Sequence, residues 1–441
     1  MLAKLGLSEA SELYEAVPDR LRLKRRLELP EPLTSEFELR RHVEHLLGRN
    51  RPSTRLLNFL GGGCWQHYVP AVCDEINQRA EFLSSYGAEA YTDHGKYQAF
   101  FEYASLLAEL VDMDAVSLST YDWGTAAATA IGMATRLTGR SEVLVPQTAG
   151  PERLAIIRNH LPQNVEVRRI GYDSATLLLD LDELEDALSD TCACVYVEIP
   201  SYLGHIDTQA SDIGALAHAN DSLLVVGVDP SSLGVIAPPS RFGADLVCGE
   251  LQPLGMHMHY GGGLAGFIAS PDTKEYIGEY PTFLIGITST TETGEHGYGF
   301  VDWGRTIYMQ REEGKEFTGT ATGLWAITAA VYLAAMGPRG MSELGEGIMQ
   351  RSQYAARRLS ELDGVVAPGF SAPFFKEFVV RFEHTRVRDV NRRLLDAGIF
   401  GGVDLSHDFP ELGEAALYSV TEIHSKADID RLADAIEGAL V

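Results

Sequence analysis

Basic residues are scarce in this chain. Lys and Arg number 36 against 62 Asp and Glu, and the formal net charge is −26. A surface with this excess of carboxylates repels the phosphates of nucleic acids and of anionic membranes. We therefore expect no nucleic-acid partner and no membrane partner. The acidity is typical of a solubility surface, and an acidic docking face for a protein partner is the alternative.

Cysteines and long apolar runs are also few. The five cysteines are an odd number and are scattered along the chain, at Cys64, Cys73, Cys192, Cys194 and Cys248. This usage favours reduced thiols in a cytoplasmic protein over a disulfide framework. No apolar run is long enough to cross a bilayer, and the first residues are amphipathic rather than signal-like.

A chain of 441 residues exceeds one compact core, so we expect more than one domain. Residues 1–110 are predicted to be a helical N-terminal arm or interface segment that wraps a neighbour or a second domain. Residues 111–335 are predicted to form a large α/β domain, and residues 336–441 a smaller C-terminal α/β domain.

Strand and helix patterns alternate from about residue 115 onward. The runs 141–146, 165–170, 192–200, 223–229 and 242–248 have strand character, and those around 192–200 and 223–229 are almost continuously apolar. Strands buried on both faces have this composition, which predicts a mostly parallel sheet covered by helices on both sides. Two later strands are predicted at 377–382 and 416–420, whereas 280–305 is interpreted as a loop.

A glycine-rich turn lies near the start of the chain, at Gly61, Gly62 and Gly63, and is followed by His67 and Tyr68. It lacks the Gly-Lys-Ser/Thr ending of a phosphate loop, so close backbone approach to another chain is the favoured interpretation. A cysteine nucleophile at Cys64 has no evident base beyond His67 and is disfavoured. His94 lies in an irregular stretch, 84–96.

A turn leads into a helix of small residues at Tyr121, Asp122, Gly124 and Thr125. Free N–H groups at the start of such a helix can hold a phosphate, aided by the helix dipole. Asp229 ends the predicted strand 223–229 and is interpreted as a structural carboxylate.

The loop 249–267 is rich in glycine and contains Gln252, His257 and His259 but no lysine. Two imidazoles two residues apart can converge on a metal. No carboxylate or second His-x-His pair stands at a fixed spacing, so ordinary loop histidines and no metal site are expected. The seven lysines of the chain all lie elsewhere, at Lys4, Lys24, Lys96, Lys274, Lys315, Lys376 and Lys426, and none follows a strand beside a glycine loop.

Motifs along the whole chain resemble one family, the N-terminal (alpha) subunit of the glycine cleavage system P-protein, the decarboxylating glycine dehydrogenase. No single motif decides the resemblance, but their number and order do. They are Arg22 to Arg25 with Pro30 to Leu33, Phe59 to Gly63 with His67 to Pro70, Phe101 to Tyr103, Met113 and Asp114, Tyr121 and Asp122 with Thr125 to Ala128, Asp229 and Pro230 with Ser232 to Gly234, Gly249 and Glu250 with Gln252 to Gly255, Gly261 and Gly262, Gly401 to Leu405, Pro410 to Leu412, and Val420 to Glu422.

The resemblance implies the fold of pyridoxal-phosphate (PLP) aminotransferases, fold type I. In that family two homologous subunits share the fold, and only the beta subunit carries the lysine that holds PLP as a Schiff base. Gln252 falls at the position of that lysine, and Asp229 falls where such enzymes hold the pyridinium nitrogen. The resemblance thus implies no catalytic residue and no cofactor in this chain, and PLP in a beta-type partner.

The degenerate site that the resemblance implies comprises Tyr121, Asp122, Gly124, Thr125, Asp229, Gln252, His257 and His259. Gly61, Gly62, Gly63, His67, Tyr68 and His94 are assigned to interface or ligand-facing loops. The implied complex is an α2β2 heterotetramer that takes glycine, releases CO2 and passes the aminomethyl group to the lipoyl arm of the small H-protein.

Three stretches depart from the pattern usual in the family: 88–95, 256–260 and 311–317. All three fall where ligand-facing loops are expected. They leave a second hypothesis open, in which the chain is a divergent paralogue with its own amino-acid-related ligand or reaction in a specialised pathway.

Overall fold

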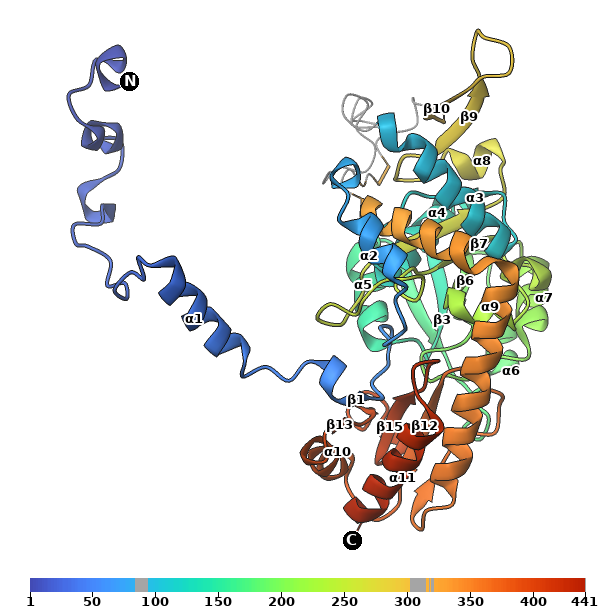
Figure 1. The fold of residues 1–441 in the computed structure, drawn as a ribbon. Coiled ribbons are helices and arrows are strands. Elements are labelled where there is room, and N and C mark those ends of the chain that lie inside the picture. The colour runs from blue at the N-terminus through green and yellow to red at the C-terminus, as the bar shows by residue number, and fades with distance from the viewer. Residues whose placement is uncertain (84–93, 302–314, 317, 319–320, 441) are drawn as a thin grey trace. The chain divides into compact units, whose positions relative to one another are not determined.

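The computed structural model describes every residue except 84–93, 302–314, 317, 319–320 and 441. The described residues form two compact units, Met1–Arg55 and Leu56–Val441 (Figure 1). The predicted helical segment near residue 309, and much of the departing stretches 88–95 and 311–317, lie outside the described residues.

The first unit is an arm of short helices. Ser35 caps α1 (Glu36–Leu47), because its hydroxyl accepts a hydrogen bond from the Glu38 N–H at 3.4 Å. Within the predicted helical arm, residues 8–17 contain a 3-10 turn, η2 (Ala10–Tyr14), whose N-cap residue is Glu9; the Glu9 N–H donates a hydrogen bond to the Glu12 carboxylate at 2.8 Å. The other 3-10 turns of the arm are η1 (Leu2–Leu5), η3 (Asp19–Leu21) and η4 (Ser53–Arg55). None of the described side chains in this unit is buried.

A seven-stranded sheet lies at the centre of the second unit, in the order β2-β8-β7-β6-β5-β3-β4. The pairs β7-β6, β6-β5, β5-β3 and β3-β4 are parallel, whereas β8 runs antiparallel to both β7 and β2. The predicted mostly parallel α/β fold is therefore confirmed. The strands are β2 (Ala115–Val116), β3 (Glu142–Pro146), β4 (Glu166–Ile170), β5 (Cys192–Glu198), β6 (Leu223–Val228), β7 (Leu246–Glu250) and β8 (Gly266–Ser270).

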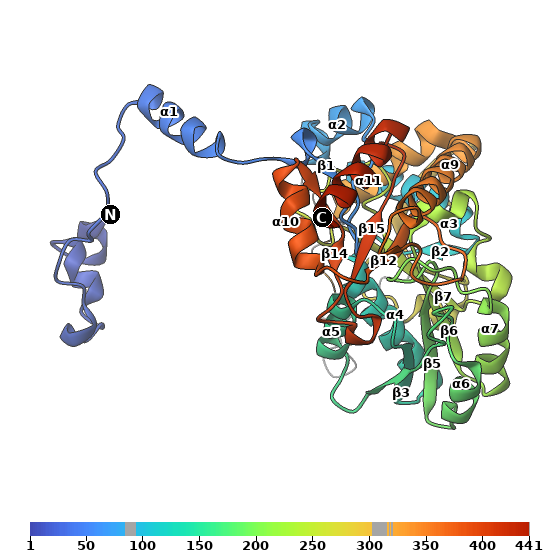
Figure 2. The same cartoon turned by 90° about the horizontal axis from the view of Figure 1, so that it is seen from below.

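Helices cover both faces of this sheet (Figures 1 and 2). On one face α4 (Trp123–Thr138), α5 (Pro151–His160) and the short α8 (Lys274–Ile277) share a core with alternate strand residues. On the other face lie α3 (Tyr97–Val111), α6 (Leu181–Ala187), α7 (Ala210–Ala219) and the first part of α9. Strands covered on both sides need apolar residues at every position, which explains their unbroken hydrophobic runs.

The C-terminal part is a four-stranded antiparallel sheet of order β11-β12-β15-β14, with its own core. The long α9 (Gly323–Ser360) joins this sheet to the central sheet. It kinks at Gly337, which has a φ of 61° and stands directly before Pro338. The strands are β11 (Val365–Val366), β12 (Glu377–Phe382), β14 (Val403–Asp404) and β15 (Ala415–Ser419), and the helices are α10 (Val387–Asp396) and α11 (Lys426–Leu440).

Smaller elements complete the second unit. β1 (Leu57–Asn58) pairs in parallel with β13 (Ile399–Phe400) and so ties the start of this unit to its C-terminal part. The remaining elements are α2 (Ala71–Asn77), η5 (Ala80–Phe82), η6 (His94–Lys96), η7 (Pro230–Gly234), η8 (Pro239–Phe242) and η12 (Pro410–Leu412). Among the described residues, no helix has the length and apolar content needed to span a membrane.

The interpretation of residues 280–305 as a loop was wrong. The segment contains a hairpin of β9 (Ile285–Ser289) and β10 (His296–Phe300) in antiparallel register. Its Thr and Gly residues are typical of turns, but the threonines are β-branched and suit a partly exposed strand.

Candidate functional site

Three acidic side chains meet at the carboxyl edge of the central sheet. Glu198 ends β5, Asp229 follows β6 and Glu250 ends β7, and all three are buried. Ligand sites of open α/β sheets form at this edge, because the loops that leave neighbouring parallel strands converge there. The predicted residues Asp229, Gln252 and Asp122 lie around this edge.

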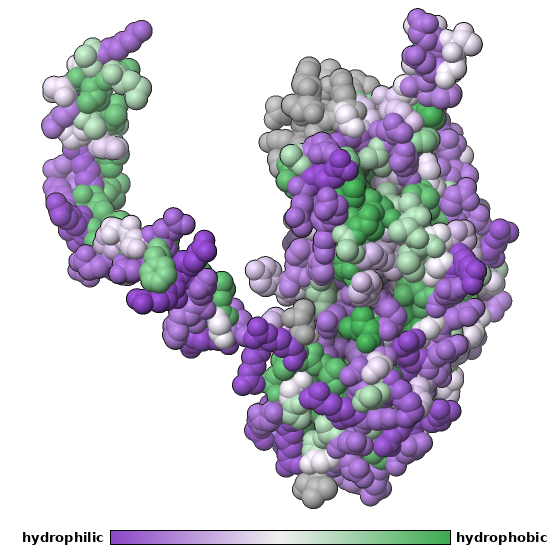
Figure 3. Space-filling model, in the orientation of Figure 1, coloured by the Kyte–Doolittle hydropathy of each residue, from purple (hydrophilic) through white to green (hydrophobic). Residues whose placement is uncertain are grey.

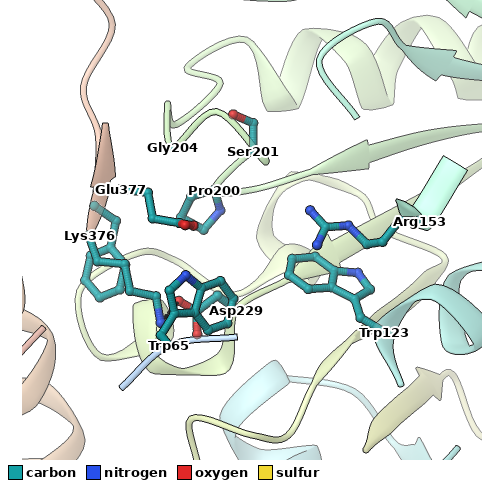
Figure 4. A pocket seen from close by; sticks show the side chains of 10 residues that line it. Trp65, Trp123, Arg153, Pro200, Ser201, Gly204, Asp229, Lys376 and Glu377 are labelled. Atoms are coloured by element: carbon teal, nitrogen blue, oxygen red, sulfur yellow. Dashed lines mark ion pairs between the residues drawn. The ribbon is translucent and has the colours of Figure 1, made fainter. Parts of the chain in front are cut away.

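Asp229 is paired with Lys376, which stands directly before β12 (Figure 4). The Lys376 Nζ lies 2.7 Å from the Asp229 Oδ2, and the two residues are only 2% and 3% exposed. The other carboxylate oxygen accepts hydrogen bonds from the N–H and hydroxyl of Ser231, at 3.0 and 2.8 Å. A buried ion pair is tolerated when its remaining polar atoms are hydrogen-bonded, as they are here.

Sequence reasoning missed Lys376, because it comes from the C-terminal sheet and not from a loop of the central one. Its Nζ also lies 3.0 Å from the His67 Nε2 and 3.6 Å from the centroid of the Trp65 ring. The His67 Nδ1 in turn lies 2.8 Å from Glu422. His67 is thus buried inside the site, whereas the next residue, Tyr68, is exposed.

Gln252 is bound entirely to backbone groups. Its Oε1 accepts a hydrogen bond from the Trp65 N–H at 3.1 Å, and its Nε2 donates to the carbonyls of Trp65 and Met256 at 2.8 and 3.0 Å. The side chain is fully buried. At this position the amide ties the segment after the glycine turn to the loop after β7, and it offers no amine for a Schiff base.

The start of α4 is capped by the chain's own carboxylates. The Asp122 Oδ1 accepts a hydrogen bond from the Thr125 N–H at 2.7 Å, and the Glu250 Oε2 accepts one from the Trp123 N–H at 3.1 Å. Gly124 is needed for packing, since a Cβ there would lie 2.6 Å from Ile156. The neighbouring Tyr121 is 48% exposed. Two of the N–H groups at this helix start, those of Trp123 and Thr125, therefore already have carboxylate acceptors.

Glu250 lies beneath this helix start and accepts further N–H bonds from Leu264 and Ala265, at 3.2 and 2.9 Å. Burial raises the pKa of Glu250 to about 8 although these hydrogen bonds act in the opposite direction. A phosphate at the same helix end would meet two carboxyl groups, which repel it when ionised.

A second buried ion pair lies beside the first. Arg153, near the start of α5, forms two hydrogen bonds of 2.7 Å to the two carboxylate oxygens of Glu198. Its guanidinium lies 4.1 Å from the centroid of the Trp123 ring, and Figure 4 shows the two side by side. The Tyr196 hydroxyl donates to Glu198 at 3.0 Å. Sequence reasoning identified neither partner.

Little space remains between these pairs. The cavity lined by Trp65, Arg153, Asp229 and Lys376 has a volume of about 10 Å³, which is room for about one water molecule. A wider pocket of about 370 Å³ lies along the glycine turn, the start of α4 and the Gly262–Gly263 loop.

Pyridoxal phosphate does not fit this interior. The cofactor needs an amine, a phosphate cradle and a free carboxylate for its ring nitrogen. Gln252, which the resemblance places at the position of the lysine, has an amide bound to backbone groups, carboxylates cap the helix start, and the Asp229 carboxylate is paired with Lys376. The cavity of about 10 Å³ between the ion pairs is far too small for the cofactor ring, and the wider pocket of about 370 Å³ is lined by the acidic residues Asp122 and Glu250.

The other predicted residues lie apart from this cluster. His257 contacts Asp74 on the surface at 3.0 Å, and His259 lies against the Trp325 ring, so the two imidazoles do not converge. Within the described parts of the chain, no three His, Cys, Asp or Glu side chains are grouped as metal ligands. Burial raises the pKa of the Cys64 thiol to about 12, which disfavours a thiolate nucleophile. His94 begins η6.

The glycine turn packs closely against the chain's own C-terminal sheet. A Cβ at Gly61 would lie 2.0 Å from a Glu377 carboxylate oxygen, and the same oxygen accepts a hydrogen bond of 2.7 Å from the Gly62 N–H. A Cβ at Gly63 would lie 3.1 Å from Arg153. The requirement for glycine at position 61 is therefore explained by the close contact with Glu377 of the same chain. The contact of this turn with another chain stays a prediction.

Glu377 predicts a pH dependence of stability. Burial raises its pKa from 4.5 to about 7, so the folded chain holds this proton more tightly than the unfolded chain. Its contribution to stability is full below pH 4.5 and is lost as the pH rises through 7. We expect Glu377→Gln to flatten the fall in unfolding free energy between pH 4.5 and 7 by at most about 1.4 kcal/mol per pH unit. Urea unfolding at several pH values measures the slope, and an unchanged slope would contradict the prediction.

Comparison with known proteins gives consistent matches along the chain. The family model "Glycine cleavage system P-protein" matches residues 1–436. Two relatives named "Probable glycine dehydrogenase (decarboxylating) subunit 1" come from Staphylothermus marinus and Carboxydothermus hydrogenoformans. The first is 38% identical and the second 36%, and the alignments cover 98% and 99% of this chain and 94% and 97% of theirs.

Solved structures agree with these matches. The inhibitor-bound crystal structure of a glycine decarboxylase (P-protein) of the glycine cleavage system superposes with a TM-score of 0.88 at 31% identity, covering 100% of this chain and 97% of that one. The sphingosine-1-phosphate lyase of Burkholderia pseudomallei superposes with a TM-score of 0.64 at 16% identity, covering 97% and 94%. The second likeness concerns the fold alone.

Proposed function

This chain belongs to the glycine cleavage system P-protein family, and we propose that it is the non-catalytic alpha-type subunit of a two-chain glycine decarboxylase. One observation carries the proposal: Gln252 occupies the position that the resemblance assigns to the cofactor lysine, and its amide is bound to three backbone groups. An amide cannot form the Schiff base on which the reaction depends.

In this proposal the beta-type partner binds PLP and the reacting glycine. The complex releases CO2 and transfers the aminomethyl group to the lipoyl arm of the H-protein, while this chain stabilises and shapes the partner's active site. The buried ion pairs at the edge of the central sheet support a structural role, since they hold the chain's own loops together.

The alternative of a divergent paralogue is not favoured. Eight relatives with 34% to 38% identity over nearly the whole chain bear the name of subunit 1. The departing loop 256–260, which is described in full, also has a structural use, because the Met256 carbonyl accepts a hydrogen bond from Gln252 and His257 contacts Asp74.

We further propose that the arm, residues 1–55, is a partner-binding segment of an α2β2 complex. Figure 3 shows apolar residues along the whole of this unit, and its exposed hydrophobic side chains include Leu13, Tyr14, Phe37 and Leu47. Side chains of this kind gain free energy when a partner covers them. Five unpaired, buried cysteines support a reduced, cytoplasmic setting.

Co-expression with a beta-type subunit tests the proposal. We expect the two chains to purify together, to catalyse exchange between glycine and CO2, and to hold one PLP per pair of chains. The isolated chain should show neither exchange nor the visible absorbance of a lysine Schiff base. A Schiff-base band in the isolated chain, or two PLP per pair, would overturn the assignment.

A further inference from the structure

The ammonium of Lys376 links segments that are far apart in the sequence. It forms an ion pair with Asp229, which follows β6, at 2.7 Å, and a hydrogen bond with His67, which follows the glycine turn, at 3.0 Å; Lys376 itself precedes β12. His67 extends the chain of contacts to Glu422, beyond β15, at 2.8 Å. The cluster therefore joins the central sheet, the glycine turn and the C-terminal sheet.

The surroundings of this ammonium form a cage. It forms an ion pair with the Asp229 carboxylate and lies within hydrogen-bond distance of the His67 Nε2 and the Ser231 hydroxyl, the last at 3.3 Å. The face of the Trp65 ring lies 3.6 Å away and adds a cation–π contact. A carboxylate, two neutral acceptors and an aromatic face are the groups that recognise a primary ammonium ion.

We propose that this cage is an ammonium-binding site, which Lys376 fills from within the chain and which keeps the site folded without a cofactor. The positive charge that a protonated cofactor ring would present to Asp229 is supplied by Lys376 instead. Lys376 is thus a positioning residue, because it acts through Asp229 and His67 and contacts no reacting group. It fixes the relative positions of the three segments that it joins.

Chemical rescue tests the cage directly. Lys376→Ala in the full-length chain removes three methylenes and the ammonium, and n-propylammonium has the same atoms. We expect the variant to unfold at a temperature several degrees lower than the parent. Propylammonium chloride should restore much of the lost unfolding temperature, with a dependence on its concentration that saturates. At equal ionic strength, the concentration needed for a given rise in unfolding temperature should be at least about tenfold lower than that of tetramethylammonium chloride. The unfolding temperature of the parent chain should change with either salt no more than it changes with NaCl at the same concentration.

Two further variants make the result specific. Asp229→Asn in the Lys376→Ala background should abolish the response to propylammonium, because the carboxylate that holds the ion is gone. Lys426→Ala is the matched control, since Lys426 is an exposed lysine paired with Asp430, and its variant should not respond. Equal effects of the two ammonium salts on Lys376→Ala, or a response that persists without Asp229, would overturn the proposal.

A different pair of variants serves if Lys376→Ala does not fold. Lys376→Met roughly keeps the volume of the side chain but leaves Asp229 buried without its cation. Lys376→Met combined with Asp229→Asn removes both charges. We expect the double variant to be clearly more stable than the single one. Equal stability of the two would refute the cage. None of these measurements needs a partner chain, so their failure is distinct from failure of the proposed function.

Discussion

Replacing Arg153 with methionine lowers the free energy of unfolding by about 3–5 kcal/mol, because one partner of a buried ion pair is lost. Both carboxylate oxygens of Glu198 accept from Arg153 at 2.7 Å, and the Glu198 side chain is buried at the end of β5. Methionine fills a similar volume, but among the described residues it leaves Glu198 with the Tyr196 hydroxyl as its one remaining side-chain donor. Urea unfolding measures the change as a shift in midpoint at constant slope.

Two controls separate the lost charge from lost packing. Arg153→Met combined with Glu198→Gln removes both charges and should recover most of the stability. Arg339→Met removes an exposed arginine that pairs with Glu343 on the surface of α9, and should change stability by less than about 0.5 kcal/mol. A loss at Arg153 no larger than that at Arg339 would show that the buried pair contributes little.

Most strands of the two main sheets could be predicted from the local pattern of apolar residues. Strand β12 begins and ends at the predicted residues, and β3 to β6 agree with their predicted ranges within two residues. Hydrophobic periodicity fixes these elements because each must bury one or both faces. The β9–β10 hairpin escaped prediction because one of its strands is mostly exposed and its glycines and threonines resemble a loop.

The position of the site was predictable, whereas its chemistry was not. Asp229 and Gln252 mark the ends of predicted strands, so their place at the sheet edge follows from the fold. Lys376 reaches His67 across 309 residues of sequence, and no local pattern encodes such a contact. One signal was available: Lys376 stands between two phenylalanines and an apolar strand, where a side chain is expected to be buried.

Under the proposed function, in which the partner holds PLP, the same contacts explain how this fold stays stable without the cofactor. A bound cofactor cross-links the loops at the sheet edge and neutralises the charges that face it. In this chain Lys376 neutralises Asp229, Arg153 neutralises Glu198, and Gln252 joins two loops by backbone hydrogen bonds. Buried charges that are left unpaired cost several kcal/mol each, so loss of a cofactor must be matched by such internal partners.

Deleting residues 1–55 should weaken association with the proposed beta-type partner by at least about 100-fold, which is about 2.7 kcal/mol. The arm presents exposed apolar side chains along its length, and burying only a few of them on a partner supplies this free energy. The remaining unit, Leu56–Val441, should keep its unfolding temperature, because its hydrophobic cores consist of its own residues. Calorimetric titration measures the affinity, and circular dichroism of the truncated chain measures its folding.

Point variants separate specific contacts from the mere length of the arm. Phe37→Ser and Leu47→Ser remove exposed apolar side chains from α1, and each should weaken binding without changing the stability of the chain. Leu395→Ser, at an exposed position on α10 in the second unit, is the matched control and should leave the affinity unchanged. If the truncated chain bound its partner with the parent's affinity, the apolar arm would have another use and the interface would lie wholly within residues 56–441.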